Sequence, residues 1–476
     1  MSEQNRDHKV LKAGLSYTVG NMLSKGLSFF SIFIFARLMT PADYGIYNTF
    51  GAYVSILAVV IGFALHTSIK NARMDYGERL DSYCSSVTIL TLGNSALLLV
   101  VALLFSGPLS QLLSISRTLV ILVVLESFAT AMLSFYYDYL AINYLSREYL
   151  AVSLLYAIFG IGLSVVLVTT VFSGARYMGR VFGTLIPLLA VAVYALFRFY
   201  RKSRPTVNRE FWKYGLKISL PIVPHGLSQL LLSQFDRIMI KKIIGDTESG
   251  LYSFSYNVGI IFQVITNSMD TAWTPWFFER MADEDYDTIR KKATNYVSFV
   301  SVLAAGLMLI SPELISIMGG AQYSESRYVV LPIVLAMYYS FLYTIPSCVE
   351  YYYKKTNLIA AGTMLAAVSN IILNAIFIPR YGYVAAAYTT VFCYLLYFLI
   401  HVFLARSIHG SYLFDMRVLT FWLVVITVFS FICLALVDFM LIRMAILAAA
   451  LLAALFLALR YRSELHAFLQ GFKKKS

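Results

Sequence analysis

A single lysine lies inside the first hydrophobic segment of the chain, among other polar side chains. Asn21 and Lys25 are four residues apart, and Thr18 and Ser28 extend the same helical face. A charge near the middle of a membrane costs about 3 kcal/mol, so Lys25 should face a protein interior or a water-filled cavity. This pattern predicts a cationic contact for an anionic substrate. The alternatives are a structural ion pair or a side chain that reaches the membrane surface.

A histidine occupies the matching place in a later segment. His225 is followed on one helical face by Gln229, Ser233 and Asp236, and two prolines stand just before it. Prolines at these positions predict a kinked helix. A histidine that faces a cavity could bind an anion when protonated, although a simple hydrogen-bonded role is the alternative. We therefore expect His225 and Gln229 to join Lys25 and Asn21 in binding substrate.

Two further segments carry carboxylates beside other polar side chains. Gln263, Asn267 and Asp270 share one face of a segment, and Glu350 lies near the end of another. Gln263 and Asn267 extend the predicted substrate site. Asp270 and Glu350 could couple transport to H+ or Na+. They could instead balance basic residues or be solvated at the membrane surface.

Tyrosine and phenylalanine are abundant, with 35 Tyr and 34 Phe. Tyr338, Tyr339 and Tyr343 could stack on sugar rings. The alternative is a belt at the membrane surface, where amphipathic rings usually gather in membrane proteins.

The composition indicates which elements hold these residues. Hydrophobic residues make up 59% of the 476 residues and charged residues only 13%, far from a soluble domain. Apolar runs long enough to cross a membrane recur throughout, and about fourteen can be distinguished. Because lipid offers no partners to backbone groups, these runs should be helices. The fold class expected is an all-α polytopic membrane protein.

The distribution of basic residues predicts the orientation. The chain carries a formal charge of +13. When the apolar segments are threaded through a membrane, most Lys and Arg fall on the same side of it as the N-terminus, above all between 198 and 217. This bias indicates that both termini are cytoplasmic. It also favours contact with anionic lipid over nucleic acid as the role of the basic stretch.

The chain repeats one pattern, which predicts two similar halves. Ser24–Ser28 aligns with Pro224–Ser228, and Tyr44–Tyr47 aligns with Ser249–Tyr252. Repeats in a membrane chain are typical of transporters whose site lies between the halves. We expect pseudo-symmetric six-helix lobes at 1–205 and 206–407, and two additional C-terminal transmembrane helices within 408–476. Lys25 and His225 should then face each other across a cavity.

Nothing in the sequence predicts a cofactor or a metal site. The four cysteines lie in or beside apolar segments without paired spacing, and no nucleotide-binding loop is found. Polar loops are short, which speaks against a membrane enzyme with a large catalytic loop. Movement of a substrate should therefore run on an ion gradient or on use of the product outside.

Three stretches resemble one family of exporters: Ala36–Tyr47, Phe235–Ile240 and Ile378–Ala387. They are similar to the polysaccharide-flippase branch of the multidrug/oligosaccharidyl-lipid/polysaccharide (MOP) exporter superfamily, which includes the O-antigen (Wzx-type) flippases. The resemblance implies two six-helix lobes around a central cavity.

The resemblance also implies a function in lipopolysaccharide or other surface polysaccharide synthesis. A prenyl-diphosphate-linked oligosaccharide would move from the cytoplasmic to the outer leaflet of the bacterial inner membrane by alternating access. Membrane lipids, H+ or Na+, and a polysaccharide polymerase or glycosyltransferase are the expected partners. The alternative function is an ion-coupled multidrug or metabolite antiporter of the same superfamily.

Overall fold

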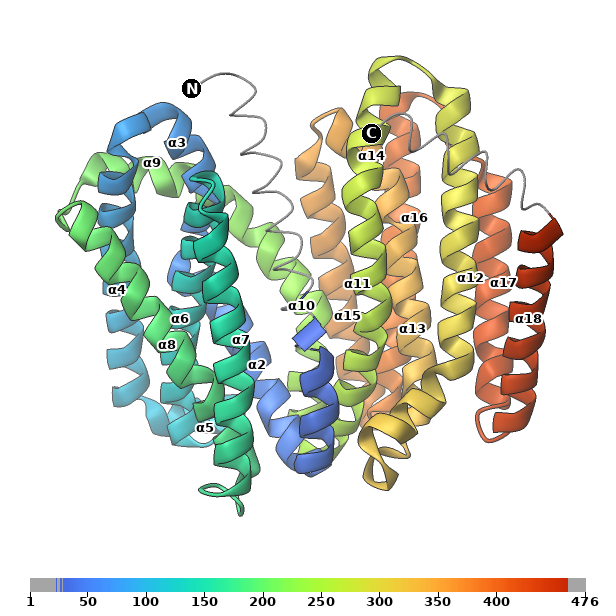
Figure 1. Ribbon diagram of the computed structural model, residues 1–476, viewed down its shortest axis with the longest axis horizontal. Helices are drawn as coiled ribbons and strands as arrows, with labels where there is room; N and C mark the ends of the chain where they lie inside the picture. Colours follow the sequence, from blue (N-terminus) through green and yellow to red (C-terminus); the bar gives the residue numbers. More distant parts are fainter. Residues whose placement is uncertain (1–22, 24–25, 28, 461–476) are drawn as a thin grey trace.

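The chain folds into helices joined by short connections (Figure 1). The computed structural model describes residue 23, residues 26–27 and residues 29–460, and this part contains no strand. The first helix described in full is Phe29–Leu38. The α-helices that follow are α2 (Pro41–Gly62), α3 (Ile69–Tyr76), α4 (Leu80–Leu104), α5 (Ser106–Leu113), α6 (Arg117–Ile142), α7 (Ser146–Thr169), α8 (Arg176–Lys202), α9 (Arg209–Ser219), α10 (Val223–Ile243), α11 (Asp246–Ala282), α12 (Tyr286–Gly319), α13 (Ser326–Leu342), α14 (Thr344–Tyr352), α15 (Thr356–Tyr381), α16 (Val384–His409), α17 (Met416–Ala435) and α18 (Met440–Arg460).

Ten helices of the described part are long and apolar enough to cross a membrane. Each apolar segment expected from the sequence contains a helix, the first one described in full only from residue 29 onwards. The expectation of an all-α membrane fold is therefore confirmed. The expected number of about fourteen membrane-spanning helices is only approximate. α10 and α11 are long but are not among the ten, and these are the helices with the polar faces noted in the sequence.

The helices form two bundles that stand side by side (Figure 1). The first bundle contains α3 to α9, and the second contains α10 to α18. α2 lies between them and packs on α6 of the first bundle and on α10 and α11 of the second. Its start is fixed locally, because Pro41 occupies its first turn and the Thr40 side chain accepts a hydrogen bond from the backbone N–H of Asp43 (3.1 Å).

The apolar segment that contains His225 is broken. α9 ends at Ser219, a single 3₁₀ turn covers Leu220–Ile222, and α10 begins at Val223. The break agrees with the kink expected from Pro221 and Pro224. The basic stretch before it is therefore partly helical rather than a plain loop.

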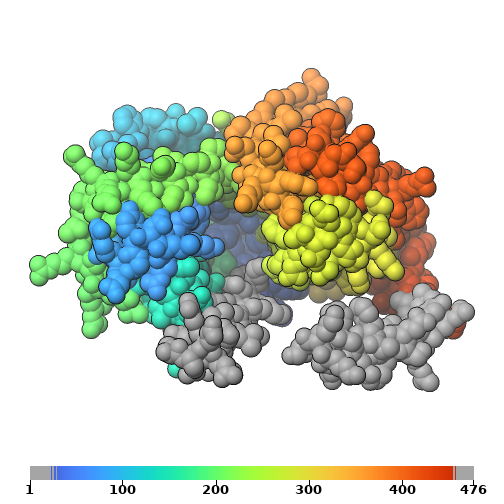
Figure 2. Space-filling model, turned by 90° about the horizontal axis from the view of Figure 1, so that it is seen from above, coloured from blue at the N-terminus to red at the C-terminus, as the bar shows by residue number. Residues whose placement is uncertain are grey.

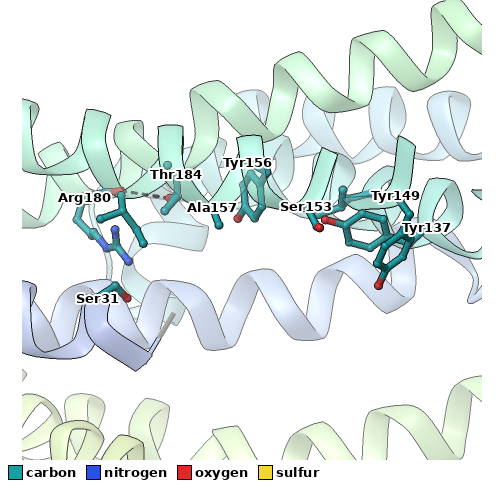
Figure 3. A pocket seen from close by; sticks show the side chains of 11 residues that line it. Ser31, Tyr137, Tyr149, Ser153, Tyr156, Ala157, Arg180 and Thr184 are labelled. Carbon is teal, nitrogen blue, oxygen red and sulfur yellow. Dashed lines mark hydrogen bonds between the residues drawn. The ribbon is translucent and has the colours of Figure 1, made fainter. Parts of the chain in front are cut away.

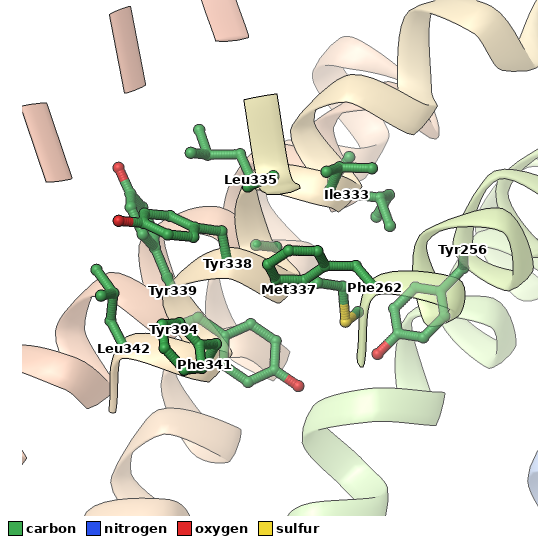
Figure 4. Close-up of a cluster of buried hydrophobic side chains, with 14 of the residues drawn as sticks. Tyr256, Phe262, Ile333, Leu335, Met337, Tyr338, Tyr339, Phe341, Leu342 and Tyr394 are labelled. Carbon is green, nitrogen blue, oxygen red and sulfur yellow. The ribbon is translucent and has the colours of Figure 1, made fainter. Parts of the chain in front are cut away.

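α13 is the central helix of the second bundle. Every residue from Val329 to Leu342 is buried, as expected for a helix that is apolar on all sides. Figure 4 shows part of this core. Tyr338 and Tyr339 belong to it, and their hydroxyls hydrogen-bond Ser301 and Thr427. The expectation that these two tyrosines meet sugars or the membrane surface is wrong, because neighbouring helices enclose them.

The last two helices pack on the outside of the second bundle, against α12, and α17 also against α13 (Figure 1). A buried ion pair holds α18 in place: Arg443 binds both carboxylate oxygens of Glu313 at 2.6 and 2.8 Å. The same guanidinium donates to the carbonyls of Leu309, Leu436 and Val437. Every donor direction of this arginine thus meets an acceptor, as a charge within an apolar layer requires.

Candidate functional site

The two bundles are closed against each other at one face, where α2 and α11 begin. Gly45 and Gly250 lie at the crossing of these helices, and a Cβ on either one would overlap a backbone carbonyl of the other helix. Thr49 and Ser249 hydrogen-bond across the crossing at 3.1 Å. Asn257 donates to the Tyr44 hydroxyl at 2.8 Å. We call this side the closed face.

A reciprocal pair of side-chain caps completes the closed face. Arg37 donates to the carbonyls of Ile317 (2.6 Å) and Met318 (3.1 Å), at the end of α12. In the other direction, Gln322 donates to the carbonyls of Ala36 (2.8 Å) and Met39 (3.2 Å), at the end of helix Phe29–Leu38. Each side of this contact therefore supplies donors to carbonyls that a helix end leaves without partners.

The opposite face is hollowed between the bundles (Figure 2). It carries α3, α9 and the turn between α11 and α12 (Figure 1). We call it the open face. A molecule closed on one side and hollowed on the other holds one of the two states that alternating access requires.

A cavity of about 260 Å³ lies in the wall of the first bundle (Figure 3). We call it the first cavity; its lining includes Ser31, Tyr137, Tyr149, Ser153, Tyr156, Arg180 and Thr184. Tyr149, Ser153, Tyr156 and Gly160 follow one another along one side of α7, so this wall extends for about 16 Å. Arg180 lies at one end and the tyrosine pair Tyr137–Tyr149, with ring centres 4.7 Å apart, at the other.

Arg180 is the cation of the first cavity. Its side chain is 9% exposed, and its guanidinium carbon lies 3.7 Å from the ring centre of Phe35 and 5.2 Å from that of Tyr47. Its Nε and Nη1 atoms have no hydrogen-bond partner among the described residues. Glu126 on α6 forms no ion pair with it in the described part; this carboxylate instead accepts a hydrogen bond from Thr184 (3.5 Å). A buried guanidinium with unused N–H donors is suited to an anionic ligand.

A cavity of about 220 Å³ lies in the second bundle, and it contains four of the residues predicted from the sequence. We call it the second cavity. Its lining includes Gln229, Ser233, Tyr256, Gln263, Asn267, Asp270 and Tyr343. Asp270 accepts hydrogen bonds from Tyr296 (2.8 Å) and Thr344 (3.4 Å). α10 and α11 thus bring together amide and hydroxyl groups, which can replace water around sugar hydroxyls.

The remaining predicted residues have different environments. Lys25 and Asn21 lie outside the described residues, so their predicted role stays a prediction. His225 is half-buried in the first turn of α10, and its Nδ1 has no partner in the described part. Glu350 is fully buried beside His401. Solvation of Glu350 at the membrane surface, which the sequence left open, is therefore wrong.

Asp236 points into the second bundle rather than into a cavity. Its buried carboxylate accepts hydrogen bonds from Tyr252 (2.5 Å), Asn374 (2.6 Å) and Thr390 (2.9 Å). These donors come from α11, α15 and α16. Asp236 therefore ties α10 to three neighbouring helices.

Sequence reasoning missed the first cavity. Arg180 follows a short turn and resembles a loop charge, and the tyrosines of α7 resemble membrane-surface residues. Arg180 and Thr184, spaced four residues apart on one face of α8, are the signal that could have indicated the site.

Comparisons with known proteins agree with this architecture. Protein 1 of the Lsg locus of Haemophilus influenzae is 23% identical over 378 residues, which cover 76% of this chain and 89% of that protein. Agl15 of Haloferax volcanii, named a probable low-salt glycan biosynthesis flippase, is 21% identical over 385 residues, 80% of each chain.

Two solved structures show a similar fold. The lipid II flippase MurJ in its inward closed conformation has a TM-score of 0.65 and 15% identity, covering 94% of this chain and 99% of that one. An inward-facing multidrug resistance MATE transporter of the MOP superfamily has a TM-score of 0.62 and 14% identity, covering 84% and 99%. The family model described as polysaccharide biosynthesis protein matches residues 10–281, more than half of the chain. By this match, the chain belongs to the polysaccharide biosynthesis protein family.

Proposed function

We propose that this protein is a flippase that moves a lipid-linked oligosaccharide between the leaflets of a membrane. The observation that carries the proposal is the first cavity, where a buried arginine with two nitrogens that lack hydrogen-bond partners among the described residues stands at one end of a tyrosine-lined wall. A prenyl-diphosphate-linked glycan combines an anionic group with sugar rings. Arg180 supplies donors to the anion, and the tyrosines supply flat faces and hydroxyls to the sugars.

The second cavity supports the same substrate class. Gln229, Gln263 and Asn267 offer amide donors and acceptors without adding charge. The prenyl tail needs no such groups, because it can remain in the lipid. Lys25 and Asn21 are proposed to add to the site from the first helix.

Transport then consists of alternation between two states, each of which is closed at one face and open at the other. With cytoplasmic termini, the open face is cytoplasmic and the closed face is the outer one. In this proposal the lobes 1–205 and 206–407 are the moving units, and the contacts of Arg37, Gln322 and the glycine crossing break when the outer face opens. The protein acts as a transporter in the bacterial cytoplasmic membrane, without catalysing a covalent step, and delivers glycan to a polymerase or a glycosyltransferase.

Substitution of Arg180 tests the proposal. In a host strain that lacks the chromosomal copy, Arg180→Ala should abolish surface polysaccharide at normal protein levels, whereas Arg180→Lys should retain part of it. Loss of a charge-assisted contact is worth about 1.5–3 kcal/mol, roughly a ten- to hundredfold loss of affinity. Arg117→Ala is the matched control, because Arg117 lies at the start of α6, outside both cavities.

Two outcomes would contradict the proposal. One is full polymer export by an Arg180→Ala protein that is inserted normally. The other is export of soluble cationic drugs with unchanged polysaccharide in the deletion strain, which would indicate the antiporter function.

A further inference from the structure

A histidine and a glutamate form a fully buried pair in the second bundle. Nδ1 of His401 on α16 lies 2.6 Å from Oε1 of Glu350 on α14, and neither side chain is exposed. The two residues are far apart in the sequence and meet only through the packing of α14 on α16. This pair takes no part in either cavity lining.

Each partner keeps one polar atom unused. Oε2 of Glu350 and Nε2 of His401 have no hydrogen-bond partner among the described residues. Space beside Nε2 exists because residue 362 is glycine, since a Cβ there would lie 3.1 Å from Nε2. An ionised carboxylate beside a neutral imidazole has a net charge of −1, which is costly in a dry interior. One added proton, on Nε2 or on the carboxylate, makes the pair neutral overall.

A short chain of side chains joins the pair to the second cavity. The Tyr397 ring centre lies 4.5 Å from that of His401 and 4.2 Å from that of Tyr343, which lines the cavity. Gln229, another lining residue, donates to the Tyr397 hydroxyl at 3.4 Å. A change in the charge or position of His401 therefore reaches two residues of the cavity wall.

The other titratable groups around the pair belong to several helices. His225 faces His401 from α10, and Asp270 of α11 bonds to Thr344 at the start of α14. Tyrosines 343, 351 and 397 surround the pair. α15 contributes Gly362 and Thr363, which do not titrate, and Thr363 hydrogen-bonds the Tyr397 hydroxyl. A positive charge on His225 would repel one on His401.

We propose that the Glu350–His401 pair is a proton-binding site that links the state of the molecule to pH. Both side chains of the pair are fully buried in this structure, in which the open face is hollowed. The neutral pair, which carries the added proton, therefore belongs to this state. Loss of the proton leaves a net negative charge that requires water, and this favours rearrangement of α14 and α16 toward the opposite state. Acid pH therefore stabilises the state with an open cytoplasmic mouth. This inference does not depend on the substrate carried.

Spin labels across the open face test the proposal without substrate. The four cysteines are all buried, so cysteines introduced at Met74 on α3, which is 85% exposed, and at exposed Asp287 on α12 can be labelled selectively. In detergent or nanodiscs, the fraction with the longer distance between the labels should fall as pH rises. The ratio of the two states should change by up to about tenfold per pH unit for linkage to one proton.

Variants of the pair test whether it carries the pH dependence. Glu350→Gln removes the negative charge with little change of shape, so the longer distance should persist at all pH values. His401→Gln leaves Glu350 able to bind and release the proton, so its profile should keep the same sign and move along the pH axis, and the decision rests on Glu350→Gln. His66→Gln is the matched control, since His66 lies near a carboxylate, Asp138, in the first bundle; its profile should match that of the starting protein.

A Glu350→Gln protein that keeps the starting pH profile would overturn the proposal, as would a profile of opposite sign. Loss of the profile in His66→Gln with its retention in Glu350→Gln would assign the linkage to the first bundle instead. A failed flippase assay would leave the pH profile unaffected, so the two proposals can fail separately.

Discussion

Arg37→Ala should shift the molecule away from the state in which the closed face is sealed. The guanidinium makes two hydrogen bonds to the end of α12, with the carbonyls of Ile317 and Met318. Since the side chain is exposed, each bond contributes about 0.5–1 kcal/mol rather than the larger value of a buried charged contact. Loss of both weakens the closed state by about 1–2 kcal/mol, or roughly five- to thirtyfold in the ratio of the two states.

The label pair at residues 74 and 287 measures this shift. Weakening the closed face should increase the population with the shorter distance between the labels at the open face. Gln322→Ala should act in the same direction, because Gln322 caps the opposite helix end. Arg117→Ala removes an arginine outside this contact and should leave the distances unchanged. An unchanged distance distribution in the Arg37→Ala protein, at a pH where both states are populated, would refute the role assigned to the caps.

Two further predictions follow from contacts between distant helices. Cysteines at Thr49 and Ser249, whose hydroxyls lie 3.1 Å apart, should form a disulfide that stops polysaccharide export, and a reductant should restore it; export by a fully cross-linked protein would contradict the need for separation at this face. Arg443→Ala should lower stability by about 3–5 kcal/mol, because Glu313 is left without its partner, and should show as a lower melting temperature in detergent with export per folded molecule retained.

Much of the fold could be predicted because the membrane imposes it. Apolar length determined the helical segments, and two prolines indicated the break before α10. The packing of the last two helices could not be predicted. Arg443 resembles an isolated charge in an apolar run, and its pairing with Glu313 depends on how α18 lies against α12.

The candidate site was predicted in part. Helical spacing correctly grouped Gln263, Asn267 and Asp270, since residues on one face of one helix remain together in any packing. Arg180 and the Glu350–His401 pair escaped detection, because their surroundings come from helices distant in sequence. The polar pattern of a single segment does not show whether a side chain lines a cavity or packs against neighbouring helices.

The glycine crossing also bears on the symmetry of the fold. Gly45 and Gly250 occupy corresponding positions in the sequence repeat, and they are also the residues that meet in the fold. A surface that touches its own copy is the mark of an isologous interface, the kind found on the two-fold axis of a homodimer. The closed face therefore has the geometry of a dimer contact contained within one polypeptide. The bond between Asn257 and Tyr44 departs from this symmetry, because it is not repeated across that axis.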